Sequence, residues 1–567
     1  MESTGVDFSS SVAPKLFTPT PVEVWAQLRP DWLILEGEEA VYVHERWLAS
    51  VRDRRCQLEV RQSQTEPSQT KPSQAEHSQA EHSQTKDTGI GQSQSLYPLV
   101  LIAESDPQQF LVAFWAALLA NWHIALANPR WGTQEWQSVN KLIAPTVVWG
   151  EAVPEHIFPT DAFVSDAQSV SAYGAASQIL IPTGGTSGHI KFAHHTWQTL
   201  LASVNGFCQY FSPHSPVDSY CVLPLYHVSG LMQVLRSVVS GGQIAIAPFK
   251  TLDAAMPAAP LPFGPGSECI HTECIHTAST HSSGVDAEVE TGARGGASAP
   301  ALRFLSLVPT QLHRLLQSGK SQWLRQFHAV LLGGAPAWST LLDLAQQQTI
   351  PISLSYGMTE TAAMVTALKP DAFLSGNRSN GSPLPHATIH IFNGNTAQSL
   401  PTAQSPHKIG QIVISASSLA LQSLPEQPLC TDDLGYFSAE GQLYVTGRAS
   451  QTIISGGENI FPTEVEAAIR STGQVKDICV FGLPDAQWGE AVTAVYVPCS
   501  DAITVQSLQR SLSTAPADTS LPRLSRYKHP KHWFALPSLP RNAQGKLNRQ
   551  AVMAQIQPLL QSLLHSK

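Results

Sequence analysis

Charged residues are scarce in this sequence of 567 residues. Lys, Arg, Asp and Glu together make up 14% of the chain, and the formal net charge is −9. The chain has no long basic run, so a nucleic-acid partner has little support. Hydrophobic residues make up 43%, which excludes a chain that is disordered as a whole. A chain of this length exceeds one hydrophobic core, so we expect several domains.

A disulfide framework and a secretory leader are also lacking. The eight cysteines are spread from Cys56 to Cys499 in no recognisable pattern, as is usual for proteins of the reducing cytosol. The N-terminal residues, MESTGVDFSSSVAPKLF, do not combine a basic segment with a following apolar one. We therefore expect a cytoplasmic protein.

One apolar stretch, FLVAFWAALLANWHIALA at residues 110–127, falls short of a membrane span. Asn121 and His123 interrupt it, and its continuous part is shorter than the roughly 20 residues that a span requires. Asp106 and Pro107, just before it, are typical of a helix N-cap and a first helical position. The pattern predicts a buried helix over this stretch.

Two segments cannot contribute to a core. Residues 63–95 contain a tandem pentapeptide repeat, and residues 264–300 are rich in Gly, Ser, Ala and Thr. We expect both to be disordered surface inserts. The second contains ECIHT twice, which places Cys269, His271, Cys274 and His276 close together. Their spacing matches no usual zinc pattern, so a duplicated pentapeptide is the preferred interpretation over a metal site.

Elsewhere, strand-like and helix-like runs alternate. Strands are expected at 97–103, 145–150, 243–247, 303–308 and 328–332, with helices at 310–317 and 337–348. This alternation predicts an α/β architecture with largely parallel sheets. After about residue 380, short strands predict a smaller β-rich subdomain. From about residue 449 a last unit mixes strands with helices at 462–470 and 549–564.

A Gly-rich loop, IPTGGTSGHIK at residues 181–191, follows a strand-like run. Its backbone N–H groups, its hydroxyls and Lys191 suit phosphate oxygens. It is not a Walker A loop, because Gly184 and Gly188 are one residue too close and His189 follows. A flexible turn is an equally good interpretation of this loop taken alone.

Three further segments carry polar groups suited to a nucleotide. YGMTE at residues 356–360 places a hydroxyl and a carboxylate after a strand, which suits phosphate and Mg²⁺. Asp433 in TDDLGY and Arg448 in VTGRAS suit ribose hydroxyls. SLPRNAQGKLNR, at residues 538–549, contains Lys546 after a glycine. Each segment alone could equally be an ordinary turn or surface loop.

In this order, the segments resemble the adenylate-forming (acyl-activating, AMP-binding) enzymes. The resemblance covers roughly residues 97–555 apart from the inserts and includes ISGGENIFPTEVE after the expected hinge. It implies a large N-terminal domain, residues 1–448, of αβαβα-layered subdomains plus a small β-barrel-like subdomain. A mobile α+β domain, residues 449–567, would follow. The sequence departs from the family at Gly184, Phe192, His189 and Ile190, and Ser450 leaves the identity of the hinge residue open.

The resemblance also implies an ATP-dependent reaction with Mg²⁺ as cofactor and CoA as co-substrate. The implied catalytic residues are Lys546, Thr359, Glu360 and His227, with Glu360 as the metal ligand. The implied nucleotide and cofactor residues are Thr183, Gly184, Gly185, Thr186, Ser187, Gly188, Lys191, Gly334, Ala335, Pro336, Tyr356, Gly357, Asp433, Arg448 and Gly457. The implied acyl-substrate residues are His227, Ser229, Arg236 and Gly333.

Within that family, PLYHVSGLMQVLR, LLGGAPAW and SYGMTETAAM resemble the o-succinylbenzoate–CoA ligases of naphthoquinone (menaquinone or phylloquinone) synthesis. Arg236 would then face the second carboxylate of a dianionic acid, although a helix-surface arginine is a somewhat better explanation of this residue taken alone. Three alternatives stay open: a ligase for another aryl or medium-chain acid, an enzyme that adenylates for a carrier protein, and an inactive scaffold. The sequence leaves the oligomeric state open, with a homodimer as one option.

Overall fold

The protein is described here from a computed structural model. The structure describes residues 19–28, 31–35, 49–59, 98–150, 153–154, 157, 177–184, 190–212, 214–254, 261–263, 301–392, 407–421, 427–514, 524–541 and 547–565. Both expected inserts, including the ECIHT repeat, therefore lie outside the described residues.

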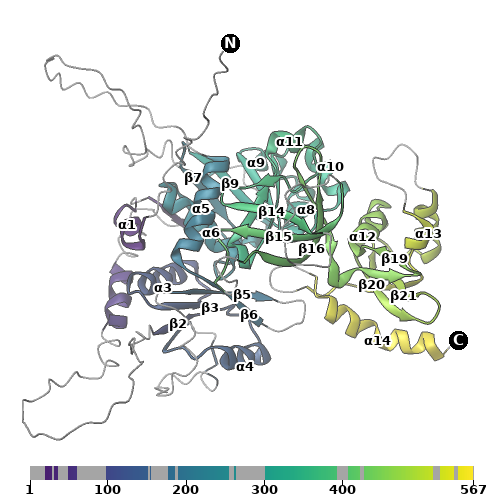
Figure 1. The fold of residues 1–567 in the computed structure, drawn as a ribbon, viewed down its shortest axis with the longest axis horizontal. Helices are drawn as coiled ribbons and strands as arrows, with labels where there is room; N and C mark the ends of the chain where they lie inside the picture. Colours follow the sequence, from purple (N-terminus) through teal and green to yellow (C-terminus); the bar gives the residue numbers. More distant parts are fainter. Residues whose placement is uncertain are drawn as a thin grey trace, which may run out of the picture.

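A five-stranded sheet forms one side of the large N-terminal part, with the strand order β4-β2-β3-β5-β6 (Figure 1). Its neighbouring strands are parallel except for β5 and β6, which form an antiparallel hairpin. The elements of this layer are β2 (Leu99–Ile102), α3 (Pro107–Leu119), β3 (His123–Leu126), α4 (Thr133–Leu142), β4 (Val147–Trp149), β5 (Ile179–Gly184) and β6 (Ile190–His195).

Helix α3 begins as the sequence predicts but is shorter than predicted. The Asp106 side chain accepts a hydrogen bond from the backbone N–H of Gln109, and Pro107 is the first helical residue. The prediction of one helix over residues 110–127 is wrong, because the helix ends at Leu119 and strand β3 begins at His123. Asn121 has a φ of 60°, a left-handed conformation that asparagine tolerates better than most residues. The chain thereby turns back, and its second apolar half becomes a central strand.

An eight-stranded sheet forms the second side, with the strand order β1-β8-β7-β9-β10-β11-β12-β13. The strands from β1 to β11 are parallel to their neighbours, and β12 and β13 add antiparallel strands at one edge. Its strands are β1 (Leu33–Leu35), β7 (Val217–Cys221), β8 (Ile244–Ile246), β9 (Leu302–Leu307), β10 (Ala329–Leu332), β11 (Ile352–Met358), β12 (Ala363–Ala367) and β13 (Ser382–Pro383).

Helices α5 and α6 lie between the two sheets. One buried cluster combines residues of α3, α5 and α6 with inward residues of β2, β3, β5, β7 and β8. Further clusters cover the outer faces of both sheets, which confirms the αβαβα layering. Further helices of this part are α1 (Pro21–Ala26), α5 (Trp197–Phe211), α6 (Val228–Ser240), α7 (Phe249–Ala254), α8 (Pro309–Gln317), α9 (Ser321–Leu324), α10 (Ser339–Gln347) and α11 (Pro370–Leu374), and residues 49–59 are also helical.

The β-rich subdomain predicted after residue 380 is a four-stranded antiparallel sheet in the order β14-β15-β16-β17. Its strands are β14 (Ala387–Phe392), β15 (Gly410–Ala416), β16 (Leu429–Phe437) and β17 (Leu443–Arg448). Strand β17 leads through a short 3₁₀ turn, η2 (Ala449–Gln451), into the C-terminal unit.

The C-terminal unit is an α+β sheet in the order β19-β18-β21-β20, with β22 paired to β21. It contacts the large part through the Thr463 hydroxyl, which donates to the Thr446 carbonyl at 2.7 Å, and through Arg470, whose guanidinium carbon lies 5.6 Å from the centre of the Trp338 ring. Its elements are β18 (Ile453–Ser455), β19 (Glu458–Ile460), α12 (Pro462–Ser471), β20 (Val475–Asp485), β21 (Gly489–Pro498), α13 (Val505–Thr514), η3 (Arg526–Lys528), β22 (His532–Ala535) and α14 (Arg549–His565).

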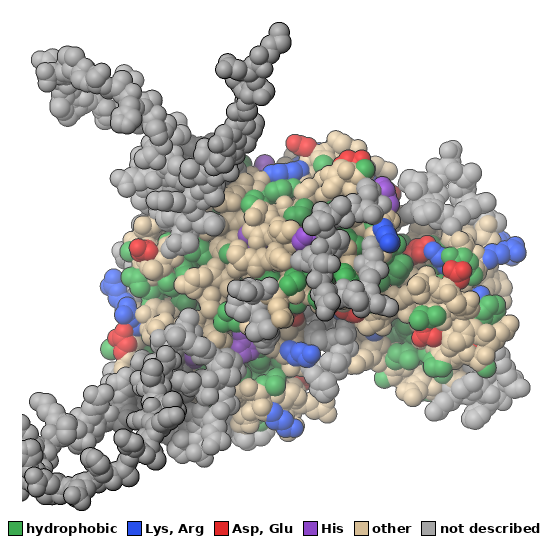
Figure 2. Space-filling view, viewed as in Figure 1, with side chains coloured by type: hydrophobic (Ala, Val, Ile, Leu, Met, Phe, Trp, Pro, Cys, Tyr) green, Lys and Arg blue, Asp and Glu red, His purple; other side chains and the backbone are tan. Residues whose placement is uncertain are grey.

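Charges of both signs are interspersed over the face drawn in Figure 2. Among the described residues, no helix combines the length and the hydropathy needed to cross a bilayer.

Candidate functional site

The predicted phosphate loop is the turn of the β5–β6 hairpin. Thr183 pairs with Lys191 across this hairpin, and Gly184 pairs with Ile190. The antiparallel pairing therefore brings the two ends of the loop together, although they are separated in sequence. Four of the predicted residues, Gly185, Thr186, Ser187 and Gly188, lie outside the described residues.

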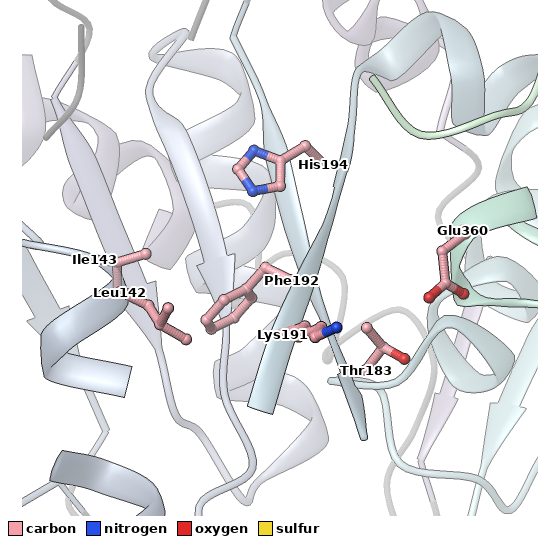
Figure 3. A pocket seen from close by; sticks show the side chains of 7 residues that line it. All are labelled: Leu142, Ile143, Thr183, Lys191, Phe192, His194 and Glu360. Carbon is pink, nitrogen blue, oxygen red and sulfur yellow. The ribbon is translucent and has the colours of Figure 1, made fainter. Parts of the chain in front are cut away.

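A cavity of about 260 Å³ lies beside this hairpin and is lined by Leu142, Ile143, Thr183, Lys191, Phe192, His194 and Glu360. Figure 3 shows Lys191 and Thr183 on the side of the hairpin that faces the Glu360 carboxylate, whereas Phe192 points towards Leu142. The structure thus brings together a hydroxyl, a cation and a carboxylate that the sequence placed in two distant motifs. The sequence alone did not predict His194, because a histidine within a strand has no sequence signal of its own.

Backbone geometry fixes Glu360 in place. Thr359 and Glu360 belong to a short 3₁₀ turn, η1 (Thr359–Thr361), directly after β11. The two following residues, Ala362 and Ala363, have φ values of 51° and 84°, which cost energy in residues other than glycine. The Ser203 hydroxyl donates to the Ala362 carbonyl at 2.6 Å, so helix α5 holds the strained turn.

A buried histidine supports the same turn. The ring of His195 is fully buried, and burial lowers its pKa to about 4, so it is neutral at pH 7. Its Nε2 lies 2.8 Å from the Thr359 carbonyl and its Nδ1 lies 3.0 Å from the Thr199 hydroxyl. Because a carbonyl can only accept, Nε2 carries the proton and donates, while Nδ1 accepts from Thr199.

Gly357 is required by the close approach of two strands. A Cβ atom at this position would lie 2.0 Å from the Ala363 carbonyl oxygen of the neighbouring strand β12. No side chain fits there without moving the backbone. The glycine of the YGMTE segment therefore lets β11 and β12 pair closely next to Glu360.

A second group of predicted residues meets at Asp433. The Tyr356 hydroxyl donates to Asp433 Oδ2 at 2.8 Å, and Arg448 Nε donates to Oδ1 at 3.2 Å. Asp433 and Arg448 face each other across β16 and β17. Burial and the adjacent carboxylate both raise the pKa of Tyr356, so this phenol stays protonated as a donor. Three residues from separate motifs thus form one polar cluster.

The GGAP segment lies at the carboxyl end of β10, beside β11. Gly333 has little room for a side chain, since a Cβ would lie 2.9 Å from the Ser355 hydroxyl. Gly334 has a φ of 77°, and Gly334, Ala335 and Pro336 are exposed. This places the segment at the edge where parallel sheets usually bind ligands.

The residues predicted for the acyl substrate lie at the start of α6 and along it. His227 is the N-cap residue and is 9% exposed, Ser229 is exposed in the first turn, and Arg236 is 3% exposed in the third turn. The Arg236 guanidinium stacks on Phe207 of α5, with its carbon 4.1 Å from the ring centre. Burial lowers the pKa of Arg236 to about 10, so it still carries its charge at pH 7.

In the C-terminal unit, Gly457 lies in the tight turn between β18 and β19. Gly456 and Gly457 have φ values of 62° and 85°, and the flanking residues Ser455 and Glu458 are paired. A two-residue hairpin turn of this kind requires left-handed residues. Lys546 lies outside the described residues; Arg541 and Leu547, on either side of its segment, form an antiparallel bridge.

The residues that could hold a metal ion are few. Within the described ranges, no group of three or more His, Cys, Asp and Glu side chains lies close enough to hold one. Glu360, across the cavity from Thr183, is the carboxylate available beside the hairpin. This fits Mg²⁺, which commonly takes only one or two carboxylates from a protein and completes its shell with phosphates and water.

Two family models match the chain. The model described as AMP-binding enzyme matches residues 298–422, and the one described as AMP-binding enzyme C-terminal domain matches residues 464–546.

Curated relatives and solved structures agree with these matches. The 2-succinylbenzoate–CoA ligase of Enterococcus faecalis is 29% identical over 401 residues, covering 69% of this chain and 70% of that protein. The Bacillus subtilis enzyme of the same name is 28% identical, covering 66% and 68%. The fold matches the o-succinylbenzoate CoA synthetase (MenE) of Bacillus subtilis in complex with OSB-AMP, with a TM-score of 0.67, 22% identity and coverage of 94% and 98%. MatB from Rhodopseudomonas palustris with bound ATP has a TM-score of 0.60 at 20% identity, covering 82% and 90%.

Proposed function

We propose that this chain is a member of the AMP-binding enzyme family and an ATP-dependent acyl–CoA ligase that activates o-succinylbenzoate. Two findings support the proposal: the polar cavity at the hairpin, and the similarity of the chain to 2-succinylbenzoate–CoA ligases. The proposed reaction uses ATP and CoA as co-substrates and Mg²⁺ as cofactor, and it passes through an acyl-adenylate intermediate.

The observation that carries the choice of acid is the buried guanidinium of Arg236. In the described part of the chain, neither Nε nor Nη2 of Arg236 has a hydrogen-bond partner, and both atoms are inaccessible to solvent. These two N–H groups lie along one edge of the guanidinium and form a fork that fits the two oxygens of a carboxylate. Leaving a buried charge without an anion is costly. A dianionic acid would supply that anion with its second, unactivated carboxylate.

A polar stripe on α6 supports a path by which the acyl substrate reaches Arg236 from the surface. Ser229, Gln233 and Arg236 are spaced by four and three residues and so share one face of the helix. Ser229 is exposed, whereas Gln233 and Arg236 are 2% and 3% exposed. The stripe therefore runs from the surface into a helix whose other residues from Gly230 to Val239 are buried and, apart from Ser237, apolar. A buried helix in a core has no structural need for such a stripe.

In the first step, a substrate carboxylate oxygen bonds to the α-phosphorus of ATP, and the bond from that phosphorus to the bridging oxygen breaks. Pyrophosphate leaves with the electron pair. Carboxylate and triphosphate repel each other, so the site must supply positive charge and close positioning. We assign Lys546 to the carboxylate and α-phosphate, and Lys191 with the Thr183 hydroxyl to the departing phosphates.

Glu360 would hold Mg²⁺, which when bound supplies further positive charge to the phosphate oxygens. The cluster of Tyr356, Asp433 and Arg448 would bind the ribose hydroxyls, because an ionised carboxylate held by two donors still has lone pairs to accept from them. Gly334, Ala335 and Pro336 would lie along the adenine.

In the second step, the thiolate sulfur of CoA bonds to the acyl carbon and AMP leaves with the electron pair, while the thiol proton passes to solvent. A lysine that favours adenylate formation also favours its reversal, so withdrawing Lys546 commits the intermediate to the thioester. We propose that residues 449–567 rotate about Ser450 or a neighbour. That rotation would place the Gly457 turn beside the thiol in place of Lys546.

The Lys546→Ala variant tests the first step. We expect loss of pyrophosphate exchange and of thioester formation from o-succinylbenzoate, CoA and Mg-ATP, by a factor of about 100 or more. Thioester formation from chemically supplied acyl-adenylate should persist, because Lys546 takes no part in the second step. Lys528→Ala is a matched control, since that lysine pairs with Glu464 away from the assigned roles. Full exchange by Lys546→Ala would disprove the assignment.

A panel of acids and acceptors separates the alternatives. Aryl and medium-chain monoacids in the exchange assay test for a different acid, and a phosphopantetheinylated carrier protein in place of CoA tests the acceptor. An inactive scaffold would release no AMP with any acid.

We propose that the enzyme is cytoplasmic. We also propose that its assembly as a homodimer be tested by light scattering. The described cysteines Cys56, Cys208, Cys221, Cys430, Cys479 and Cys499 are free thiols, which is in keeping with a reducing compartment.

A further inference from the structure

A histidine that no sequence motif singles out packs on helix α5, the same helix on which the Arg236 guanidinium lies. His386 immediately precedes strand β14, far in sequence from α6. In the described part of the chain, neither of its ring nitrogens has a hydrogen-bond partner, and both are inaccessible to solvent. Burial, with the Arg236 charge as a second cause, lowers the pKa of His386 to about 4. The imidazole is therefore neutral at pH 7, with one N–H donor and one acceptor nitrogen.

Helix α5 holds both side chains at two adjacent residues. The Arg236 guanidinium stacks on Phe207, and the His386 ring packs against Gly206. A Cβ at position 206 would lie 1.8 Å from His386 Nδ1, so only glycine leaves room for the ring. Glycine inside a helix costs about 1 kcal/mol relative to alanine. The helix therefore carries a destabilising residue where the imidazole lies.

Unpartnered buried polar atoms are rare in folded proteins and usually call for an explanation. Here the orphaned atoms of two neighbouring side chains, Arg236 and His386, converge on one short segment of α5. A carboxylate placed between them would accept from the Arg236 fork and from the one imidazole N–H.

We infer that His386 is a specificity-determining residue, which with Arg236 binds the unactivated carboxylate of the acyl substrate in a subsite above Gly206 and Phe207. The inference rests on the proposed function. It predicts that His386 contributes to the choice of dianionic over monoanionic acids and takes no part in the chemistry at the activated carboxylate.

The test compares two acids on the full-length enzyme. One is o-succinylbenzoate, and the other is 4-oxo-4-phenylbutanoate, which lacks the aromatic carboxylate. The variant His386→Phe keeps an aromatic ring of similar size and removes the N–H donor. We expect KM for the diacid to rise roughly 10- to 100-fold, the usual effect of losing a hydrogen bond to a charged group. KM for the monoacid, and kcat for both acids, should change less than about 3-fold.

Three further variants guard against a merely structural effect. His386→Gln, which restores an N–H donor, should recover part of the preference for the diacid. Gly206→Ala should lose the preference as His386→Phe does, because its methyl group displaces the ring. His390→Phe is the matched control, since it removes a histidine of the adjoining strand β14 that also has an unpartnered Nδ1. It should leave the ratio of the two KM values unchanged.

The outcomes separate the inference from the proposed function. A wild-type enzyme that does not prefer the diacid would overturn the proposed substrate, and the inference with it. A wild-type preference that survives intact in His386→Phe, or equal losses for both acids in that variant, would overturn the inference alone.

Discussion

At the scale of single residues, the Asp433 cluster makes the most direct prediction about ATP. Tyr356→Phe removes one of the two donors to the Asp433 carboxylate and keeps the ring. Losing one such hydrogen bond costs about 1 to 2 kcal/mol, so KM for ATP should rise roughly 5- to 30-fold.

Steady-state rates at varied ATP measure this change. The control is Tyr436→Phe, whose ring stacks on Tyr444 in the same sheet and has no assigned role. Unchanged KM for ATP in Tyr356→Phe would rule out a nucleotide-binding role for this phenol.

Short motifs, in which residue types follow each other in a fixed order, let the sequence predict residues that lie together in the structure. Asp433 and Arg448 were both selected from short motifs, and the structure pairs them directly. His194 and His386 could not be selected in this way. Their significance depends on neighbours such as Glu360 and Gly206, which the sequence does not place beside them.

At the scale of elements, the pairing of β11 with β12 depends on Gly357. Gly357→Ala would place a methyl carbon 2.0 Å from a backbone oxygen, so the strands must separate beside Glu360. We expect a loss of about 3 kcal/mol or more in the free energy of unfolding, as is usual for strongly overpacked sites. Pyrophosphate exchange should fall by at least 10-fold in the molecules that fold.

Urea unfolding and the exchange assay measure both effects. Gly447→Ala in β17 is the control, because its Cβ would have 3.4 Å to the nearest atom, and its stability should change by less than about 1 kcal/mol. If the two variants were equally stable, the close pairing of β11 and β12 would not require glycine at position 357.

Most of the strands and helices that periodicity predicted lie within a few residues of the observed elements, for example β9, β10, α8 and α12. It failed in the stretch after Leu119, because an unbroken apolar run has the same appearance in a buried helix and in a buried central strand. Two features make the second half of this stretch a strand. Asn121 turns the chain, and the strands on either side of β3 form hydrogen bonds with its backbone. Partners in a sheet are not visible in the sequence of one strand.

At the scale of the whole molecule, buried histidines predict a loss of stability in mild acid. Burial lowers the pKa of both His123 and His195 to about 4 from an ordinary value of 6.5. The unfolded chain therefore binds protons first as the pH falls. The stabilisation that comes from keeping His123 and His195 neutral in the folded protein is complete above about pH 6.5. It is lost as the pH falls towards 4. At pH 5 the loss is about 2 kcal/mol for each histidine.

Urea unfolding followed by tryptophan fluorescence at pH 7.5, 6 and 5, at constant ionic strength, measures this loss. His195→Gln should show a weaker pH dependence, because its amide can donate to Thr359 and accept from Thr199 without titrating. A free energy of unfolding that stays constant from pH 7.5 to pH 5 would contradict the prediction.

The alternation of elements predicted largely parallel sheets, and the family resemblance implied their layering, but neither predicted the contact of the C-terminal unit. Thr463 and Arg470 meet Thr446 and Trp338 through a few polar and aromatic contacts. Such small interfaces leave no periodic signal in either partner, so only the assembled structure reveals them.

Strand β16 carries two adjacent aspartates whose side chains point to opposite faces of its sheet. Asp433 faces inward to Tyr356, whereas Asp432 faces outward and accepts from the backbone N–H of Ser450 at 3.1 Å, at the proposed pivot. A shift of the strand register by one residue would turn each aspartate to the opposite face, so that neither carboxylate would keep its present contact. A single-residue insertion or deletion in this strand should therefore impair both ATP binding and the proposed rotation of residues 449–567. Natural variation in length is accordingly expected in the turns around β16 and not within the strand.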